Sequence, residues 1–499
     1  MQDAEVDVES VRNATLEAYQ RGPGAVVNLV TKLAAQIENL STRMAALEAD
    51  NATLRAKLDT NSRNSSKPLS SDGPGVKPHP KRQRPQAERK TGGQPGHRGH
   101  HVALVEDPDE VELHAPMRCA GCGRSLEGLP VVEVERRQII DIPPIRPYVV
   151  EHRAETKRCP DCGTETSGGF PAGLAAPVQY GPNVLTTAVY LNQEQLLPEE
   201  RTCEVLADLF QCPLSVGTLE RAVGQCFGQL ARPEAAIRQA VEQASVAHFG
   251  ETGLNIAGHN HWLHVASTAR LTFYASHAKR GRAAMTAIGV LKNFHGRAIH
   301  DGLAGYWQFA HCQHGLCNAH HLRELTFVAE ELQQPWAAEL KTLLLDIKRD
   351  VNRARAENQT ALAPEVKVAF SARYATILAT GLTLNPPPQA TGQRGRPKRG
   401  KAGSLVDRLR QQKEATLAFM EDFSVPFDNN QAERDIRMTK TRQKVSGCFR
   451  TTEGARRFCR IRGYISTLRK QGVSILSALA QAIVRHPPLP PDVQVSSPE

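Results

Sequence analysis

The sequence predicts a multidomain α+β protein, and three observations support this fold class. The chain has 499 residues, which is more than a single hydrophobic core usually supports. Apolar residues at heptad spacing predict a long helix near the N-terminus, whereas short apolar runs separated by turn residues predict strands after Ser245. Stretches rich in Pro, Gly and Ser separate these regions and mark the expected domain boundaries.

Positive charge is concentrated in two segments. The chain carries 62 Lys and Arg against 52 Asp and Glu, a net charge of +10. Residues 434–470 alone contribute +10 (twelve basic residues minus two acids), and residues 77–98 contribute +6 (seven minus one). Such clustering favours a nucleic-acid partner, with a solvated basic face as the alternative for either segment.

Several classes of protein are not favoured. The sequence contains no run of eighteen apolar residues and no signal peptide, so we expect no membrane contact. Eleven cysteines in a long chain without an export signal do not indicate a disulfide framework, and a reducing cytoplasm fits them best.

Residues 25–58 are predicted to form a dimerising coiled coil. Heptad positions a and d hold, in chain order, Val30, Leu33, Ile37, Leu40, Met44, Leu47, Asn51 and Leu54. Leu at d and a lone Asn at a favour a parallel two-stranded coil, although a single amphipathic helix packed on its own protein is the alternative. A basic linker rich in Pro, Gly and Ser follows at 59–105, and its composition predicts a flexible arm.

A zinc-ribbon-like module is predicted at 106–167. Two Cys-x2-Cys pairs, Cys119 with Cys122 and Cys159 with Cys162, have the spacing of a tetrahedral Zn²⁺ site, and coincidental pairs are the alternative. Strands are expected at 131–134 and 148–152 between them.

Residues 175–243 are predicted to form a helical, DNA-binding-like region. Two helices, 199–210 and 215–227, are separated by a short turn, which resembles a helix-turn-helix. Ser215 is a plausible N-cap of the second helix. Core packing without DNA contact is the alternative.

The pattern from 244 to 485 indicates a ribonuclease-H-like α/β core. Strands are expected at 247–249, 254–256, 262–267, 271–276 and 297–300, with a helix at 283–291. The last strand ends on Asp301, a helical insertion occupies about 310–425 with a helix at 405–422, and a later helix at 431–439 carries Glu433. In this fold, carboxylates converge on two Mg²⁺ or Mn²⁺ ions. The tail, 486–499, is expected to be disordered.

The sequence resembles the DDE-type transposases of the IS sixty-six group of bacterial insertion sequences. The resemblance rests on motifs that occur in order along nearly the whole chain. They are Asn64–Pro68, Gly92–His97, the paired cysteines, Ala176–Pro182, His261–Val265, His300–Gly302, Cys317–Glu324 and Phe427–Arg434.

The resemblance implies a set of metal-binding acids. Asp301 corresponds to the second acid and Glu433 to the third, and both are implied Mg²⁺ ligands. The first acid is an Asp before Glu-Thr-Gly, and this chain has Gly250 there. Glu251 would replace it only if the strand bulged, because neighbouring strand residues point to opposite faces. Asp428 is expected to be an N-cap or turn residue.

The resemblance also implies further sites and partners. Cys317 and His320 match a Cys-x2-His signature beside the active site, as a buried structural pair or as metal ligands. The expected DNA contacts are the basic residues Arg434, Arg437, Lys440, Arg442, Lys444, Arg450, Arg456 and Arg457. The implied partners are DNA at the element ends and at the target, a second copy through the coil, and element-encoded accessory proteins, in the bacterial cytoplasm at the nucleoid.

Two functions follow as hypotheses. The first is a transposase that cleaves and transfers strands at element ends, impaired in this copy by Gly250. The second is a non-catalytic DNA-binding dimer that regulates its own element, for which the coil, basic arm, ribbon and helix pair suffice.

Overall fold

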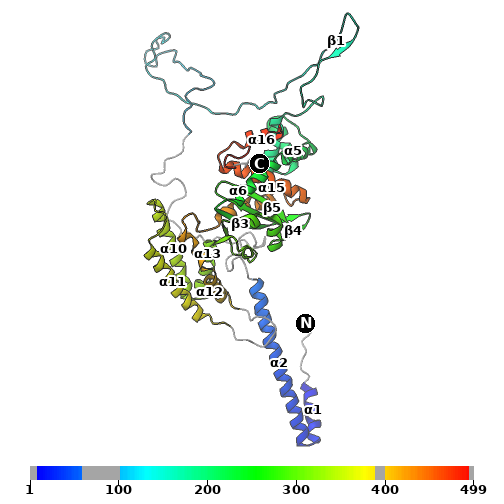
Figure 1. Ribbon diagram of the computed structural model, residues 1–499, viewed down its shortest axis with the longest axis vertical. Coiled ribbons are helices and arrows are strands. Elements are labelled where there is room, and N and C mark those ends of the chain that lie inside the picture. Colours follow the sequence, from blue (N-terminus) through cyan, green and yellow to red (C-terminus); the bar gives the residue numbers. More distant parts are fainter. Residues whose placement is uncertain (1–7, 59–101, 388–398, 494–499) are drawn as a thin grey trace. The chain divides into compact units, whose positions relative to one another are not determined.

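The computed structural model describes residues 8–58, 102–387 and 399–493 (Figure 1). The chain divides into two compact units. One comprises residues 1–73, 230–474 and 489–499, and the other comprises residues 74–229 and 475–488. Within the described ranges, no helix has the length and apolar character needed to cross a membrane.

Two helices form the N-terminal part. Helix α1 spans Val8–Gln20 and α2 spans Pro23–Leu58, so the helix of the predicted coil is confirmed. The chain reverses at Gly22, whose φ of +101° suits glycine, and Ala18 of α1 is buried. Along α2, six apolar a and d residues from Val30 to Leu47 are 36–64% exposed. The described residues of this chain therefore leave this apolar seam uncovered.

The cysteine module contains one small hairpin. Strands β1 (Thr156–Arg158) and β2 (Glu165–Ser167) pair antiparallel around the second cysteine pair. The predicted strands at 131–134 and 148–152 are wrong, because those residues form no strand and Val132 is 99% exposed. Their β-branched residues favour extended backbone, but a strand also needs a hydrogen-bonded neighbour.

Four helices make up the helical part of the second unit. They are α3 (Pro182–Val189), which continues as the π-helix η2 (Tyr190–Glu194), then α4 (Glu199–Phe210), α5 (Val216–Gln229) and α16 (Ile475–Ile483). The predicted pair 199–210 and 215–227 is confirmed as α4 and α5, and the Ser215 hydroxyl accepts the Thr218 N–H at 3.2 Å. Helix α16 groups here rather than with the core that was predicted to extend to 485.

The central sheet has five strands in the order β5-β4-β3-β6-β7. Strands β3 (Val246–Ile256), β4 (His259–Ser267) and β5 (Thr272–His277) form an antiparallel meander, whereas β6 (Arg297–His300) is parallel to β3 and to β7 (Gln313–Leu316). The predicted strand 297–300 is confirmed.

Two sheet predictions differ from the structure. The strands predicted at 247–249 and 254–256 are one strand, β3, and β7 lies within the range assigned to the insertion. Gly250 and Gly253 suggested a turn, but neighbours pack against the strand at both positions. A Cβ at Gly250 would lie 3.2 Å from the Ala432 Cβ, and a Cβ at Gly253 would lie 3.8 Å from the Lys440 Nζ.

Helices cover the sheet. Helices α14 (Asn430–Val445) and α15 (Thr452–Lys470) pack on the face that carries Leu263, Val265 and Tyr274. The predicted helix 431–439 is thus confirmed within α14. Helix α6 (Ala231–Glu242), which was predicted with the helical region, groups with the core. The helix predicted at 283–291 is two short helices, α7 (Arg282–Ile288) and α8 (Val290–Asn293), which join at Gly289 with φ +82°.

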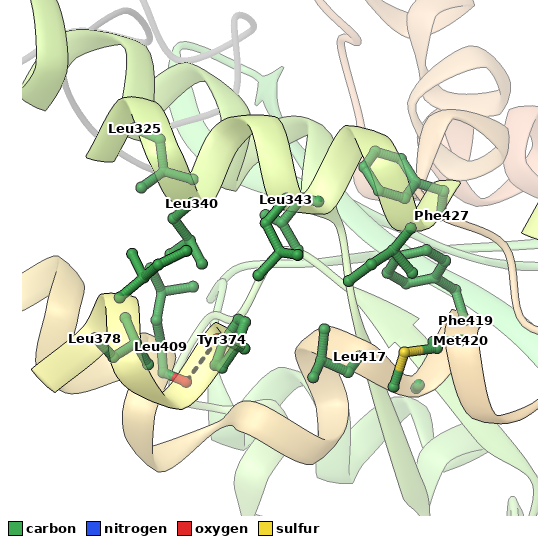
Figure 2. Close-up of a cluster of buried hydrophobic side chains, with 14 of the residues drawn as sticks. Leu325, Leu340, Leu343, Tyr374, Leu378, Leu409, Leu417, Phe419, Met420 and Phe427 are labelled. Carbon is green, nitrogen blue, oxygen red and sulfur yellow. Dashed lines mark hydrogen bonds between the residues drawn. The ribbon is translucent and has the colours of Figure 1, made fainter. Parts of the chain in front are cut away.

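The helical insertion has its own hydrophobic core. Its helices are α9 (Asn318–Glu330), α10 (Pro335–Ala356), α11 (Pro364–Leu384), α12 (Lys401–Gln411) and α13 (Lys413–Glu421). Figure 2 shows Leu340, Leu343 and Tyr374 packed between them, with the Tyr374 hydroxyl donating to the Leu409 carbonyl at 2.9 Å. The helix predicted at 405–422 is α12 followed by α13. The core extends to Phe427, which lies just before α14.

The C-terminal segment 486–493 is ordered, in contrast to the prediction of a disordered tail. Asp492 forms an ion pair with Arg270, and Val493 is buried. Residues 494–499 lie outside the described residues, as does most of the linker 59–105.

Candidate active site

The predicted acids Asp301 and Glu433 come from different elements. Asp301 directly follows β6, and its Oδ1 accepts the Leu303 N–H at 3.0 Å. Glu433 lies in the first turn of α14. Their carboxylates are close enough that Asp301 contributes to raising the pKa of Glu433.

Asn429 fixes the start of α14 against β3. Its side-chain amide donates to the Phe249 carbonyl at 2.7 Å, and its Oδ1 lies 2.8 Å from the His248 Nδ1. Asp428 accepts the Asn430 N–H at 3.1 Å, which is the turn contact expected of it. These bonds place the first turn of α14, and with it Glu433, over the middle of β3.

Gly250 faces this turn. A Cβ built at Gly250 would meet the Cβ of Ala432, the residue before Glu433. In the parallel pairing of β3 with β6, His248 lies opposite Ile299, so the same register brings Gly250 level with Asp301. A side chain at position 250 would therefore point to the face of β3 that α14 covers.

Glu251 points to the opposite face of β3 from Gly250, and both of its carboxylate oxygens accept hydrogen bonds. Its side chain is 1% exposed. Oε1 accepts from the Arg280 Nε at 3.0 Å, and Oε2 accepts from the Tyr306 hydroxyl at 2.7 Å. Residues 248–256 of β3 pair one-to-one with β4, so no bulge turns Glu251 toward Glu433.

Arg280 connects Glu251 to Asp301. Its Nη2 lies 2.9 Å from the Glu251 Oε1 and 3.8 Å from the Asp301 Oδ2. The guanidinium also lies 5.0 Å from the centre of the Trp262 ring. No feature of the sequence pattern pointed to Arg280 or Tyr306, because neither belongs to a recognisable motif.

Burial makes this centre favour a cation or a proton. Burial raises the pKa of Asp301 to about 7, the charge of Glu251 adds to that rise, and Arg280 opposes it. Burial also raises the pKa of Glu433, which Arg323 opposes and Asp428 enhances. Carboxyl groups held in this way are common at functional sites.

The Cys-x2-His signature lies beside Glu433. Cys317 follows β7, and its N–H donates to the His300 carbonyl, next to Asp301. His320 lies in the first turn of α9, with its Nε2 3.7 Å from the Glu433 Oε1. One ligand atom from each of Cys317, His320 and Glu433 lies within 4.8 Å of the other two. Burial raises the pKa of the Cys317 thiol to about 12.

The predicted DNA-contact residues divide into two groups. Arg434, Arg437, Lys444, Arg450 and Arg456 are exposed. Arg457 is partly buried and pairs with Glu453 at 3.5 Å. Lys440 is half-buried and donates to the Gly253 carbonyl, while the guanidinium of Arg442 lies 3.6 Å from the centre of the Phe449 ring. Lys440 and Arg442 thus have contacts within the protein that the charge count did not reveal.

A groove of about 520 Å³ opens along β3 and β4. Its lining includes Glu251, Trp262, Arg280, Lys440 and Gln443. Cationic and amide side chains therefore border a concave surface that Glu251 also lines.

The two cysteine pairs form similar turns. The Cys119 N–H donates to the Arg124 carbonyl and the Cys159 N–H to the Thr164 carbonyl, both at 2.9 Å. Hydrogen bonds to the sulfur lower the pKa of Cys119, to which Cys122 contributes most, and of Cys162, to which Thr164 contributes most. Among the described residues, these four sulfurs do not form a group at ligand distance, so the structure shows two separate turns.

The sheet order, its mixed strand directions and the helices on it are consistent with a ribonuclease-H-like core, the fold class predicted for residues 244–485. The family described as "Transposase IS66 family" matches residues 177–457, more than half of the chain. The chain therefore belongs to the IS66 transposase family, whose DDE chemistry implies DNA binding and DNA transposition.

Two further families match the N-terminal part. The "zinc-finger binding domain of transposase IS66" matches residues 116–163, and a family of unknown function, DUF6444, matches residues 2–103. No curated protein matches the chain.

Proposed function

We propose that this chain is a transposase that binds insertion-sequence ends and whose strand-cleavage centre lacks its first carboxylate. The observation that carries the proposal is the position of Gly250. It faces α14 at Ala432, the residue before Glu433, and the strand register brings it level with Asp301. The neighbouring acid, Glu251, lies on the other face of β3 and is held by Arg280 and Tyr306.

The donor set fits divalent-ion binding only in part. Asp301 and Glu433 would hold Mg²⁺ or Mn²⁺, and the buried Glu433 Oε1 has no hydrogen-bond partner among the described residues. A bound ion of this kind supplies an activated oxygen nucleophile and stabilises the leaving oxygen. Gly250 offers no oxygen from a side chain, so one of the three expected acids is missing and cleavage should be weak.

The exposed basic residues support DNA binding at this centre. Arg434 and Arg437 lie on α14 within one turn of Glu433, and Arg450 and Arg456 lie near the start of α15. Guanidinium groups suit phosphate oxygens because they donate in a planar fork. A DNA backbone along this surface would pass beside Asp301 and Glu433.

The N-terminal modules support assembly on two DNA ends. The exposed seam of α2 offers an apolar surface for a second copy of the chain, which would pair two subunits. Cys119, Cys122, Cys159 and Cys162 would bind structural Zn²⁺ once their two turns come together.

A non-catalytic DNA-binding regulator is the second candidate. It is favoured by one observation, the full engagement of Glu251, which leaves the centre with two acids. This candidate keeps the DNA contacts and the paired subunits, and it differs from the first in having no strand cleavage.

Cleavage of element-end DNA in Mg²⁺ or Mn²⁺ tests the proposal. We expect very weak cleavage by the natural chain and a gain on the order of 10²-fold or more in Gly250→Asp, with Gly250→Asn as a control of the same shape. In both variants the Ala432 Cβ must move away from the new Cβ by a few tenths of an ångström. No gain in Gly250→Asp would refute the assignment of position 250, and strong cleavage by the natural chain that Glu251→Ala abolishes would refute the impairment.

A further inference from the structure

Three potential metal ligands, one of them Glu433, meet at the junction of β7, α9 and α14. Cys317, His320 and Glu433 bring a sulfur, a nitrogen and an oxygen atom within 4.8 Å of one another. Cys317 and His320 are 1% and 3% exposed. Since the three residues span more than a hundred positions in the chain, the fold rather than a local turn brings them together.

The nitrogen and oxygen ligand atoms lack hydrogen-bond partners among the described residues. Neither ring nitrogen of His320 has a hydrogen-bond partner among the described residues, and the Glu433 Oε1 has none. A neutral imidazole has one N–H to donate and one lone pair to be satisfied. The 3.7 Å between the His320 Nε2 and the Glu433 Oε1 is too long for a hydrogen bond. Buried polar groups without partners are costly, and a cation between them would satisfy both.

The distance between His320 and Glu433 is close to that in a tetrahedral metal site. Bonds of about 2.0–2.3 Å at tetrahedral angles separate nitrogen, oxygen and sulfur ligands by roughly 3.3–3.5 Å. The observed 3.7 Å between Nε2 and Oε1 is close to that value. The Asn429 N–H points at the Cys317 Sγ at 3.1 Å, and such a bond stabilises a thiolate ligand.

We propose that Cys317, His320 and Glu433 bind a Zn²⁺-class ion that ties the first turn of α9 to the first turn of α14. A thiolate, an imidazole and a carboxylate form a donor set that suits Zn²⁺ and that Mg²⁺ does not use. Binding releases the thiol proton of Cys317 to solvent. The ion orients Glu433, and three protein ligands leave a fourth position for water, since the Glu433 side chain is 32% exposed.

This site is distinct from the cysteine pairs of the N-terminal module and does not rest on strand cleavage. Glu433 is its only ligand shared with the proposed Mg²⁺ or Mn²⁺ site. Zinc binding is measured without DNA, so its absence would not contradict the proposed function. Likewise, a chain that fails to cleave DNA would not contradict zinc binding.

Zinc content of the full chain tests the inference. We expect Cys317→Ala and His320→Asn each to lower tightly bound Zn²⁺, measured by mass spectrometry of the metal, by about one ion per chain. Cys312→Ala is the matched control, since Cys312 is also buried and its thiol donates to the Phe294 carbonyl. Equal zinc content in Cys317→Ala, His320→Asn and Cys312→Ala would overturn the proposal.

A spectroscopic measurement covers the case in which these variants fail to fold. The full chain with Cys119, Cys122, Cys159 and Cys162 all changed to Ser is loaded with Co²⁺. We expect one tightly bound Co²⁺ whose spectrum shows a thiolate-to-metal charge-transfer band. A chain that binds no Co²⁺, or binds it without this band, would contradict the assignment of Cys317.

Discussion

The two faces of β3 carry adjacent residues with opposite roles. On the face covered by α14, Gly250 packs against Ala432, the residue before Glu433, and offers no functional group. On the other face, Glu251 has a carboxylate, but Arg280 and Tyr306 occupy both of its oxygens. An acid within a motif therefore serves a site only when strand alternation points it there. Substitutions on each face should accordingly have different effects.

The largest effect is expected on the Gly250 face. In chains that carry Gly250→Asp, a further Asp301→Asn or Glu433→Gln should lower DNA cleavage by about 10³-fold, because each removes an anionic ligand from a site that needs three. Asp428→Asn is the control, since Asp428 serves the turn before α14. If Asp428→Asn lowers DNA cleavage as much as Glu433→Gln does, Glu433 is not a specific metal ligand.

On the Glu251 face, the expected effect is on stability. Glu251→Gln should lower the free energy of unfolding by about 3 kcal/mol, because it removes the nearer of the two carboxylates that face Arg280, at 2.9 Å against 3.8 Å for Asp301. Tyr306→Phe removes only one hydrogen bond to the Glu251 carboxylate and should cost about 1.5–2 kcal/mol. Urea unfolding followed by tryptophan fluorescence compares the two. If Glu251→Gln costs no more than Tyr306→Phe, Glu251 is not a structural anion.

Local features of the fold could be predicted from the sequence. The strand 297–300, the helix pair at 199–227 and the helix of Glu433 follow from apolar periodicity and capping, which act over a few residues. The continuous strand β3 could not be predicted, because its glycines resemble a turn until α14 is known to pack on them.

The site was predictable where a motif marks it. Asp301 and Glu433 lie in recognisable motifs, and alternation alone places Gly250 and Glu251 on opposite faces. Arg280 and Tyr306 meet Glu251 only through tertiary packing. Counting charges also could not distinguish Arg437, which is exposed, from Arg442, which lies over Phe449. The difference depends on which side of α14 faces the rest of the protein.

Acid should weaken the Glu251 face through His264, the cross-strand partner of Glu251. Burial lowers the pKa of His264 to about 4, so the unfolded chain binds a proton more readily between that pH and about 6.5. The stability contributed by neutral His264 is complete above pH 6.5 and is lost as the pH falls toward 4, by about 2–3 kcal/mol.

Urea midpoints at pH 7 and pH 4.5 measure this loss, with His264→Gln as the reference that lacks the titrating ring. We expect the pH-dependent fall to be smaller in His264→Gln than in the natural chain. An identical fall in both chains would assign the acid sensitivity to other groups.

The smallest effects separate the two kinds of basic residue on α14. Arg437→Ala should reduce the salt dependence of DNA binding by about one phosphate contact and change stability by less than about 0.5 kcal/mol. Arg442→Ala should cost about 1 kcal/mol of stability, because it removes the stack on Phe449. DNA-binding isotherms at several salt concentrations measure the first effect, and urea unfolding measures the second. If Arg437→Ala lowers stability while Arg442→Ala lowers the salt dependence of DNA binding, the roles assigned to these two residues are wrong.

Mn²⁺ binding measured by electron paramagnetic resonance tests the difference between the two faces most directly, since it requires neither DNA nor turnover. We expect Gly250→Asp to tighten Mn²⁺ binding by about tenfold or more relative to Gly250→Asn, and folded Glu251→Gln to bind Mn²⁺ as the natural chain does. Loss of Mn²⁺ binding in Glu251→Gln, with no gain in Gly250→Asp, would contradict this expectation and make Glu251 the first acid of the centre.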